Sequence, residues 1–180
     1  MPMPPMASLT PSSPPFRVTL VSPQIPANVG NVARTCAVTG CPLHLVGPIR
    51  FSLDEKSLRR AGLDYWESLA PDVHAGWLEF EARALEGQIE KLHLFSGRAR
   101  RDLFGVRFEP GDFLVFGAER TGLHPGLLDA YPERCVGIPM LPGQRSLNLA
   151  TAVGIAVYQA LRCVALPSCT DGAARPPPTR

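Results

Sequence analysis

Residues 114–123 read LVFGAERTGL, and this stretch decides the fold class. The apolar run 113–116 is a predicted strand and leads directly into a glycine turn. A short apolar run bounded by glycine is typical of a strand buried in a parallel sheet. In open α/β sheets, ligands bind at the carboxyl ends of the strands. The turn that carries Glu119 is therefore a candidate site, although a plain strand-to-helix turn would give the same pattern.

The turn does not fit the common nucleotide-binding motifs. Gly117 and Gly122 have the glycine spacing of a P-loop, but Leu123 and His124 stand where Lys and Ser or Thr are needed. Glu119 within the turn would also repel a triphosphate. The sequence has neither a G-x-G-x-x-G fingerprint nor a G-x-S-x-G nucleophile elbow. These absences argue against a kinase, a dehydrogenase and a serine hydrolase.

On both sides of this stretch, short apolar runs alternate with segments in which apolar residues recur at helical spacing. The pattern predicts further strands at 18–21, 43–46, 92–95 and 135–138, and helices at 28–39, 54–61, 77–85, 125–130 and 146–166. Ser146 is the predicted N-cap of the last helix. This alternation indicates an α/β fold with a mostly parallel sheet and helices on both faces.

Composition predicts one domain between two tails. Residues 1–15 hold six prolines and residues 167–180 are again rich in proline, so both are predicted to be disordered, leaving a folded domain at 16–166.

The sequence has no signal-peptide pattern and no apolar run long enough for a membrane span, which favours a cytoplasmic protein. Five cysteines without a C-x-x-C pair favour reduced thiols, and the scattered histidines predict no metal site.

The positive charge is carried almost wholly by arginine. The net charge is only +2, but sixteen of the eighteen basic residues are arginines. They cluster at 59–60 and at 98–101, and such groups of guanidinium suit phosphate backbones. A solvated basic loop explains each cluster equally well, so charge alone does not establish RNA binding.

Two more segments have the character of ligand loops. Residues 26–34, PANVGNVAR, open the first helix, where Asn28 can fix the backbone and Arg34 follows further along. An ordinary helix start with a surface arginine is the simpler interpretation. Residues 138–149, IPMLPGQRSLNL, join a strand end to the last helix through a stiff loop that is long enough to wrap a small ligand.

Taken in this order and at these separations, the three segments resemble the three motifs of the SPOUT superfamily of RNA methyltransferases. The resemblance covers residues 16–166. Residues 56–65, KSLRRAGLDY, are similar to the subfamily of tRNA (cytidine/uridine-2′-O)-methyltransferases. The resemblance implies methyl transfer from S-adenosyl-L-methionine to the ribose 2′-hydroxyl of the wobble nucleotide, position 34, within a tRNA anticodon stem-loop. It also implies a homodimer and a deep trefoil knot near the C-terminus.

The resemblance assigns roles to individual residues. Matches to the cofactor-binding positions of the family are Phe95, Gly117, Ile138, Ser146 and Leu147. Matches to its catalytic positions are Arg34, Asn28, Ser146 and Asn148, and Glu119 matches a further motif position.

Arg34 is expected at the ribose hydroxyl. A guanidinium stays protonated near neutral pH and is a poor base. We therefore expect Arg34 to stabilise developing alkoxide charge and to bind the adjacent phosphate, while the proton leaves through a phosphate oxygen or water.

One departure from the family pattern concerns the second motif. Relatives usually carry a basic residue directly before its glycine, whereas here Thr121 separates Arg120 from Gly122.

Two other functions fit the same resemblance. One is a ribosomal RNA 2′-O-methyltransferase of the superfamily, a type that usually has an extra RNA-binding domain for which residues 16–166 leave no room. The other is a catalytically silent RNA-binding protein on this fold. The presence of Arg34, Ser146 and Asn148 argues against such a loss of activity.

Overall fold

The computed structural model describes residues 15–52 and 66–165. The predicted tails, the predicted helix at 54–61 and the KSLRRAGLDY segment lie outside the described residues. The elements follow one another as β1 (Arg17–Val21), α1 (Pro26–Thr39), β2 (Leu43–Val46), α3 (Trp66–Leu69), β3 (Asp72–His74), α4 (Trp77–Phe80), η1 (Glu81–Leu85), η2 (Ile89–Lys91), β4 (Leu92–Phe95), β5 (Arg101–Asp102), η3 (Leu103–Gly105), β6 (Phe113–Phe116), α5 (Pro125–Ala130), η4 (Pro132–Arg134), β7 (Cys135–Gly137) and α6 (Leu149–Ala165).

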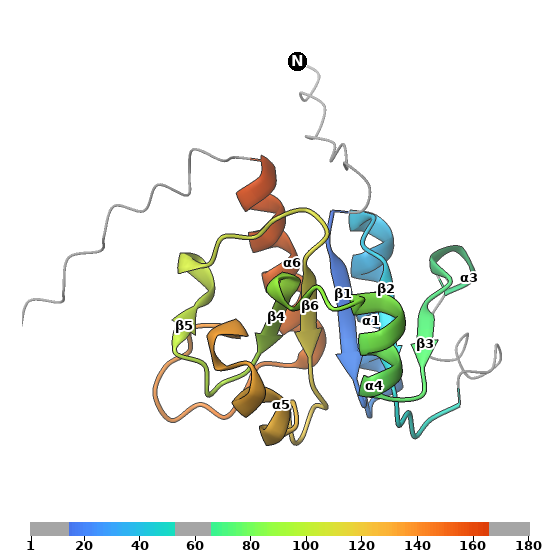
Figure 1. Ribbon diagram of the computed structural model, residues 1–180, viewed down its shortest axis with the longest axis horizontal. Coiled ribbons are helices and arrows are strands. Elements are labelled where there is room, and N and C mark those ends of the chain that lie inside the picture. The colour runs from blue at the N-terminus through green and yellow to red at the C-terminus, as the bar shows by residue number, and fades with distance from the viewer. Residues whose placement is uncertain (1–14, 53–65, 166–180) are drawn as a thin grey trace, which may run out of the picture.

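The strands form one parallel sheet in the order β3-β2-β1-β6-β4-β7-β5 (Figure 1). Every described strand pair is parallel. All four residues of β2, β4 and β6 are buried, which is the pattern of strands covered on both faces. The predicted α/β fold with a parallel sheet is confirmed.

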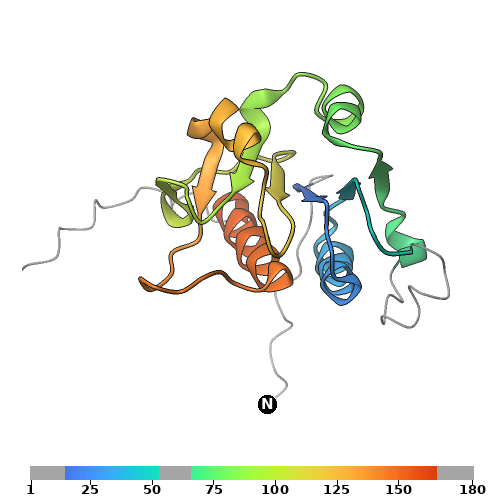
Figure 2. The same cartoon turned by 90° about the horizontal axis from the view of Figure 1, so that it is seen from below.

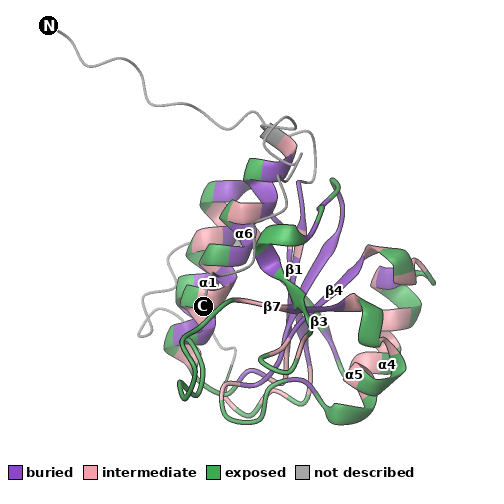
Figure 3. Cartoon of the chain, turned by 90° about the vertical axis from the view of Figure 1, so that its left-hand side faces the viewer, coloured by how far each residue is buried: buried purple, intermediate pink, exposed green. Residues whose placement is uncertain are grey.

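Helices cover both faces of the sheet. Helices α1 and α6 lie on one face, and α4 and α5 lie on the other (Figure 3). Figure 2 shows α1 and α6 side by side, in agreement with their mutual contacts. Each face has its own apolar cluster, one built on α1 and α6 and the other on Phe80, Leu85 and the strand residues opposite them. At about 25 cal/mol per Å², burial of these apolar side chains is the main force that holds the layers together.

Strand β7 lies between β4 and β5, although β4 and β5 are joined only by residues 96–100. Those residues cross β7 near its end: a Cβ placed on Gly137 would lie 3.6 Å from the Cβ of Ala99. The chain approaches β7 from α5, on one face of the sheet, and continues to α6 on the other face. At β7 the chain therefore passes from one face of the sheet to the other, close to the 96–100 loop.

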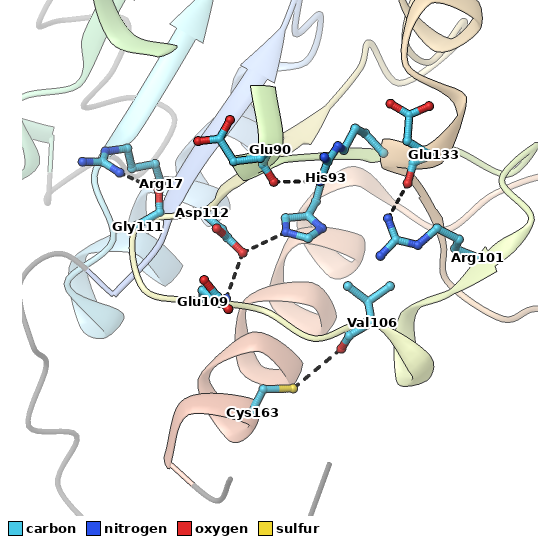
Figure 4. Close-up of polar contacts among 11 residues, drawn as sticks. Arg17, Glu90, His93, Arg101, Val106, Glu109, Gly111, Asp112, Glu133 and Cys163 are labelled. Carbon is cyan, nitrogen blue, oxygen red and sulfur yellow. Dashed lines mark hydrogen bonds and ion pairs between the residues drawn. The ribbon is translucent and has the colours of Figure 1, made fainter. Parts of the chain in front are cut away.

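The connection from β5 back to β6 is fastened by polar contacts (Figure 4). The buried His93 Nε2 lies 2.8 Å from Asp112 Oδ2, and the same carboxylate oxygen accepts a hydrogen bond from Glu109 N at 2.8 Å. Arg101 donates to the carbonyl of Glu133, just before β7. The Asp112 contacts fix the start of β6 against β4, and the Arg101 contact fixes β5 against the residues that precede β7.

A buried pair of histidines lies between β2 and β3. His44 Nδ1 is 3.2 Å from His74 Nε2 and 3.7 Å from a carboxylate oxygen of Asp72. The rings of Phe80 and Phe113 flank His44 at centroid distances of 5.8 Å. Burial lowers the pKa of His44 from 6.5 to about 4, and the neighbouring His74 and Arg17 act in the same direction against the opposing effect of Asp72.

The elements with the strongest apolar patterns lie where the sequence predicts them. Strands β2, β4 and β6 and helix α5 have the predicted bounds. The short α3, β3 and β5 were not predicted, and both residues of β5 are exposed, so no apolar signal marks it. The helix predicted at 77–85 is α4 followed by the π-turn η1. Within the described residues, no helix combines the length and apolarity needed to cross a bilayer.

Candidate active site at the carboxyl edge of the sheet

Four loops meet at the carboxyl edge of the sheet. Residues 22–25 follow β1, residues 96–100 follow β4, residues 117–124 follow β6 and residues 138–148 follow β7. Because these neighbouring strands are parallel, their carboxyl ends lie at the same edge. All three segments singled out by their sequence therefore converge there.

A chain of polar side chains links these segments. Glu119 Oε1 accepts hydrogen bonds from Asn28 Nδ2 at 3.0 Å and from Ile25 N at 3.1 Å, and its Oε2 accepts one from Gln24 N at 2.8 Å. Asn28 Oδ1 accepts a hydrogen bond from Asn148 Nδ2 at 2.9 Å. One residue from each segment thus takes part in a continuous carboxylate–amide–amide chain.

Asn148 also caps the last helix. Its Oδ1 accepts hydrogen bonds from Ala150 N at 2.9 Å and from Thr151 N at 3.3 Å, the two backbone donors that an N-cap side chain normally satisfies. The prediction that Ser146 caps this helix is therefore wrong. Helix α6 begins at Leu149, and Ser146 is exposed in the preceding loop.

Sequence reasoning missed the loop between β1 and α1. Its two backbone N–H groups, on Gln24 and Ile25, are held by Glu119. Pro23 and Pro26 flank this pair and have no N–H of their own. The spacing of the two prolines is the signal that could have marked Gln24 and Ile25 as the free donors of this segment.

The loop after β6 closes on itself tightly. Gly122 N donates to the carbonyl of Ala118 at 2.7 Å, and these two residues form an isolated antiparallel bridge. A Cβ on Gly117 would lie 2.0 Å from the carbonyl carbon of Gly122 and 2.1 Å from Leu123 N. Glycine is thus required at position 117 by the backbone of its own loop, independently of any ligand.

The other expected cofactor positions differ in exposure. Phe95 is buried and stacks on Phe116 at a centroid distance of 4.5 Å, so its backbone is what it can offer to a ligand. Ile138 is half-buried against the α1–α6 cluster, whereas Ser146 and Leu147 are exposed.

Arg34 lies apart from the polar chain. It is exposed on α1, while Asn28 on the same helix is buried. Six residues separate them, and at 3.6 residues per turn the two side chains leave different sides of the helix. Arg120 is likewise exposed at the tip of the 117–124 loop. Residues 15–52 and 66–165 contain no group of three or more metal-ligating side chains.

The parallel sheet is covered on both faces and has a glycine loop, a capped helix and a polar chain at its carboxyl edge. These features define an α/β protein of the class whose ligand sites lie at this edge. Residues 15–158 match the model of the SpoU rRNA methylase family, and the chain belongs to this family. SpoU methyltransferases use S-adenosylmethionine. The resemblance inferred from the sequence motifs is thereby confirmed.

Individual relatives are similar along nearly their whole length. The chain is 47% identical over 148 residues to the tRNA (cytidine(34)-2′-O)-methyltransferase of Burkholderia pseudomallei strain 1106a, covering 82% of this chain and 94% of that protein. It is 41% identical over 154 residues to the enzyme of the same name from Escherichia coli K12, and the match covers 84% of this chain and 96% of that protein. A solved structure described as giving insight into 2-OH methylation of C/U34 on tRNA superimposes with a TM-score of 0.74 at 42% identity, covering 83% and 96%.

Proposed function

We propose that this protein transfers a methyl group from S-adenosyl-L-methionine to the ribose 2′-hydroxyl of nucleotide 34, the wobble nucleotide, of tRNA. The observation that carries the proposal is the Glu119–Asn28–Asn148 chain, which ties the three motif segments together at the ligand edge of the sheet. The choice of tRNA follows relatives that are 41–47% identical. A tRNA substrate would place the enzyme in the cytoplasm.

The loops suit the adenosyl cofactor. Met140, Leu141 and Leu147 expose apolar side chains on the 138–148 loop, and they lie among backbone donors and acceptors at the strand ends. An aromatic base with polar edges needs both kinds of group. When bound, the cofactor supplies a methyl group on a positively charged sulfur, which is an electrophile that needs no metal.

The protein's own task is then to orient the ribose hydroxyl and to stabilise charge on its oxygen. Holding the two reactants in a near-attack geometry contributes a large part of the rate. We assign Arg34 to the hydroxyl and the neighbouring phosphate, because a fixed guanidinium can stabilise developing alkoxide charge. The Glu119–Asn28–Asn148 chain holds α1, which carries Arg34, against the start of α6.

A homodimer would complete this arrangement. Helices α1 and α6 leave apolar side chains in solvent: Val38 is 58% exposed, Ile155 37% and Tyr158 55%. An exposed apolar face on two adjacent helices favours association with another subunit. Pairing of this face between two copies would bring Arg34 to the subunit boundary, so that each active site would draw on both chains.

We also propose that the ring around β7 is a deep trefoil knot. The ring consists of β4, residues 96–100, β5, the 103–112 connection and β6, and it is held by strand pairing and by the His93–Asp112 contact. The chain enters it from the α5 face and leaves toward α6. The hydrogen bond from Cys163 Sγ to the carbonyl of Val106, at 4.0 Å, holds α6 against the outside of this ring (Figure 4).

The function is tested by nucleoside mass spectrometry on tRNA from cells that lack the protein. We expect the loss of one 2′-O-methylated nucleotide at position 34, and its return when purified protein and cofactor are added. An unchanged tRNA profile would refute the proposal, and a methyl lost from ribosomal RNA would favour the alternative substrate.

The role of Arg34 is tested in the purified enzyme. Arg34→Ala should lower kcat by at least about a hundredfold, the scale found when one transition-state donor is removed. Cofactor affinity measured by calorimetry should be unchanged. Arg34→Lys keeps the charge but loses the planar fork, so retention of most of the turnover by this variant would count against a need for the guanidinium.

A further inference from the structure

A pocket of about 340 Å³ lies between the 96–100 loop and α5. Its wall on the loop side carries Arg98 and Arg100, and its wall on the helix side carries Leu128 and Asp129. Pro132 and the buried Cys135 also line it. The volume is at the lower end of the range for small-molecule sites.

The lining combines an apolar interior with a charged rim. Leu128 is half-buried, and the thiol of Cys135 is directed to the carbonyls of Leu128 and Tyr131. The hydroxyl of Ser96, which also lines the pocket, accepts a hydrogen bond from Arg98 N at 3.2 Å. Arg98, Arg100 and Asp129 are exposed at the entrance. A planar base with a phosphate on either side fits this distribution, because arginine binds phosphate oxygens and apolar side chains cover a ring face.

The pocket lies next to the proposed active site but does not use its residues. None of Phe95, Gly117, Ile138, Ser146 and Leu147 lines it. The 96–100 loop nevertheless begins directly after Phe95, and α5 begins directly after the 117–124 loop. The pocket is therefore joined along the chain to two of the loops at the carboxyl edge, where the proposed target ribose would lie.

We propose that this pocket binds a nucleotide of the RNA substrate that flanks the methylated one, with Arg98 and Arg100 on its phosphates. This inference rests on the proposed function, because it takes RNA to be the substrate. The pocket is therefore a recognition site that measures the position of the target ribose along the strand.

The first test compares two variants of equal charge in binding to a synthetic anticodon stem-loop RNA. Arg98→Ala/Arg100→Ala removes the pocket arginines, and Arg83→Ala/Arg107→Ala removes two exposed arginines outside it. We expect the pocket variant alone to lose at least about tenfold in RNA affinity. The slope of log K against log salt should also fall by about 1.4 to 1.8, which corresponds to two phosphate contacts. Cofactor affinity by calorimetry should be unchanged in both variants.

The second test replaces the base on either side of nucleotide 34 by an abasic site. At one of the two positions the change should weaken binding to the wild-type protein and have little further effect on Arg98→Ala/Arg100→Ala, because both changes remove the same contact. Equal behaviour of the two arginine variants, additive effects of the abasic site, or a loss of cofactor affinity in the pocket variant would each overturn the proposal. If one of these results is found and the wild-type protein methylates the RNA, only the pocket proposal is refuted. If the wild-type protein methylates no RNA, the proposed function is refuted.

Discussion

At the scale of single residues, the side-chain amide of Asn148 has two functions. Its oxygen caps α6 through Ala150 N and Thr151 N, and its NH₂ group donates to Asn28. An amide has an acceptor and a donor on two separate atoms, whereas an ionised carboxylate at the same place could cap the helix but could not donate. The start of the last helix is thereby fixed relative to α1.

Two substitutions separate these two functions of Asn148. Asn148→Ala removes both and should lower the free energy of unfolding by about 1 to 2 kcal/mol through the lost cap. Asn148→Asp keeps the cap but cannot donate to Asn28 at neutral pH. We expect Asn148→Asp to keep the contribution of the cap in urea unfolding but to lose about 1 to 3 kcal/mol because two oxygens oppose each other, with activity as low as that of Asn148→Ala. An active Asn148→Asp variant would show that the donation to Asn28 is dispensable.

Glu119 offers a comparable isosteric test. Its two carboxylate oxygens accept three N–H donors, from Gln24, Ile25 and Asn28. Glu119→Gln replaces one acceptor by a donor and opposes an N–H group to an NH₂ group. We expect a loss of about 1 to 3 kcal/mol in the free energy of unfolding, as for an unsatisfied polar group, and a matching loss of turnover. Arg120→Gln, on the exposed neighbouring side chain, is the control and should leave stability unchanged.

At the scale of elements, the 117–124 loop depends on one glycine for space and on another for its backbone angles. Gly117→Ala places a Cβ about 2 Å from the backbone of Gly122 and Leu123, so the loop must move. Gly122 has φ of +69° and open space around it, so Gly122→Ala should cost only about 1 kcal/mol of backbone strain. We expect calorimetry to show loss of cofactor binding, together with a lower Tm, in Gly117→Ala and little change in Gly122→Ala. Normal cofactor binding by Gly117→Ala would mean that the loop can shift without consequence.

How far an element could be predicted depends on how its sequence signal arises. Strands β2, β4 and β6 are buried on both faces and therefore read as uninterrupted apolar runs. Strand β5 exposes both of its residues and exists because β7 pairs with it, which is information from distant parts of the chain. The start of α6 was misplaced because Ser146 and Asn148 are both good caps. Only the tertiary contact with Asn28 distinguishes them.

At the scale of the whole molecule, the convergence of the loops was predictable and their mutual contacts were not. A parallel sheet brings strand ends to one edge, so the three segments could be placed together from their sequence alone. The Glu119–Asn28 contact joins residues 91 positions apart and the Asn148–Asn28 contact joins residues 120 positions apart. Their geometry depends on the strand order, which the local pattern does not contain. For the same reason, the pocket beside α5 could not be predicted from the sequence.

The buried His44 makes the stability of the whole domain depend on pH. Its pKa in the folded protein is about 4, below the unfolded value of 6.5, so between these values the unfolded chain binds a proton that the folded chain does not. The free energy of unfolding should therefore fall as the pH drops from 6.5 to 4, by up to about 3 kcal/mol at 1.36 kcal/mol per pH unit. Urea unfolding of His44→Leu should show a shallower decrease over this window. Parallel curves for variant and wild type would exclude His44 as the cause.

The position of β7 also constrains the order in which a nascent chain can complete its structure. Strands β4 and β5 leave the ribosome before β7, yet in the finished sheet they do not pair with each other but only with β7 and, for β4, with β6. Until residues 135–137 are synthesised, β5 has no strand to pair with and β4 lacks its pairing on the β7 side. The carboxyl edge is therefore completed last, and a ribosome that stalls before Cys135 would release a chain that lacks both the 138–148 loop and helix α6.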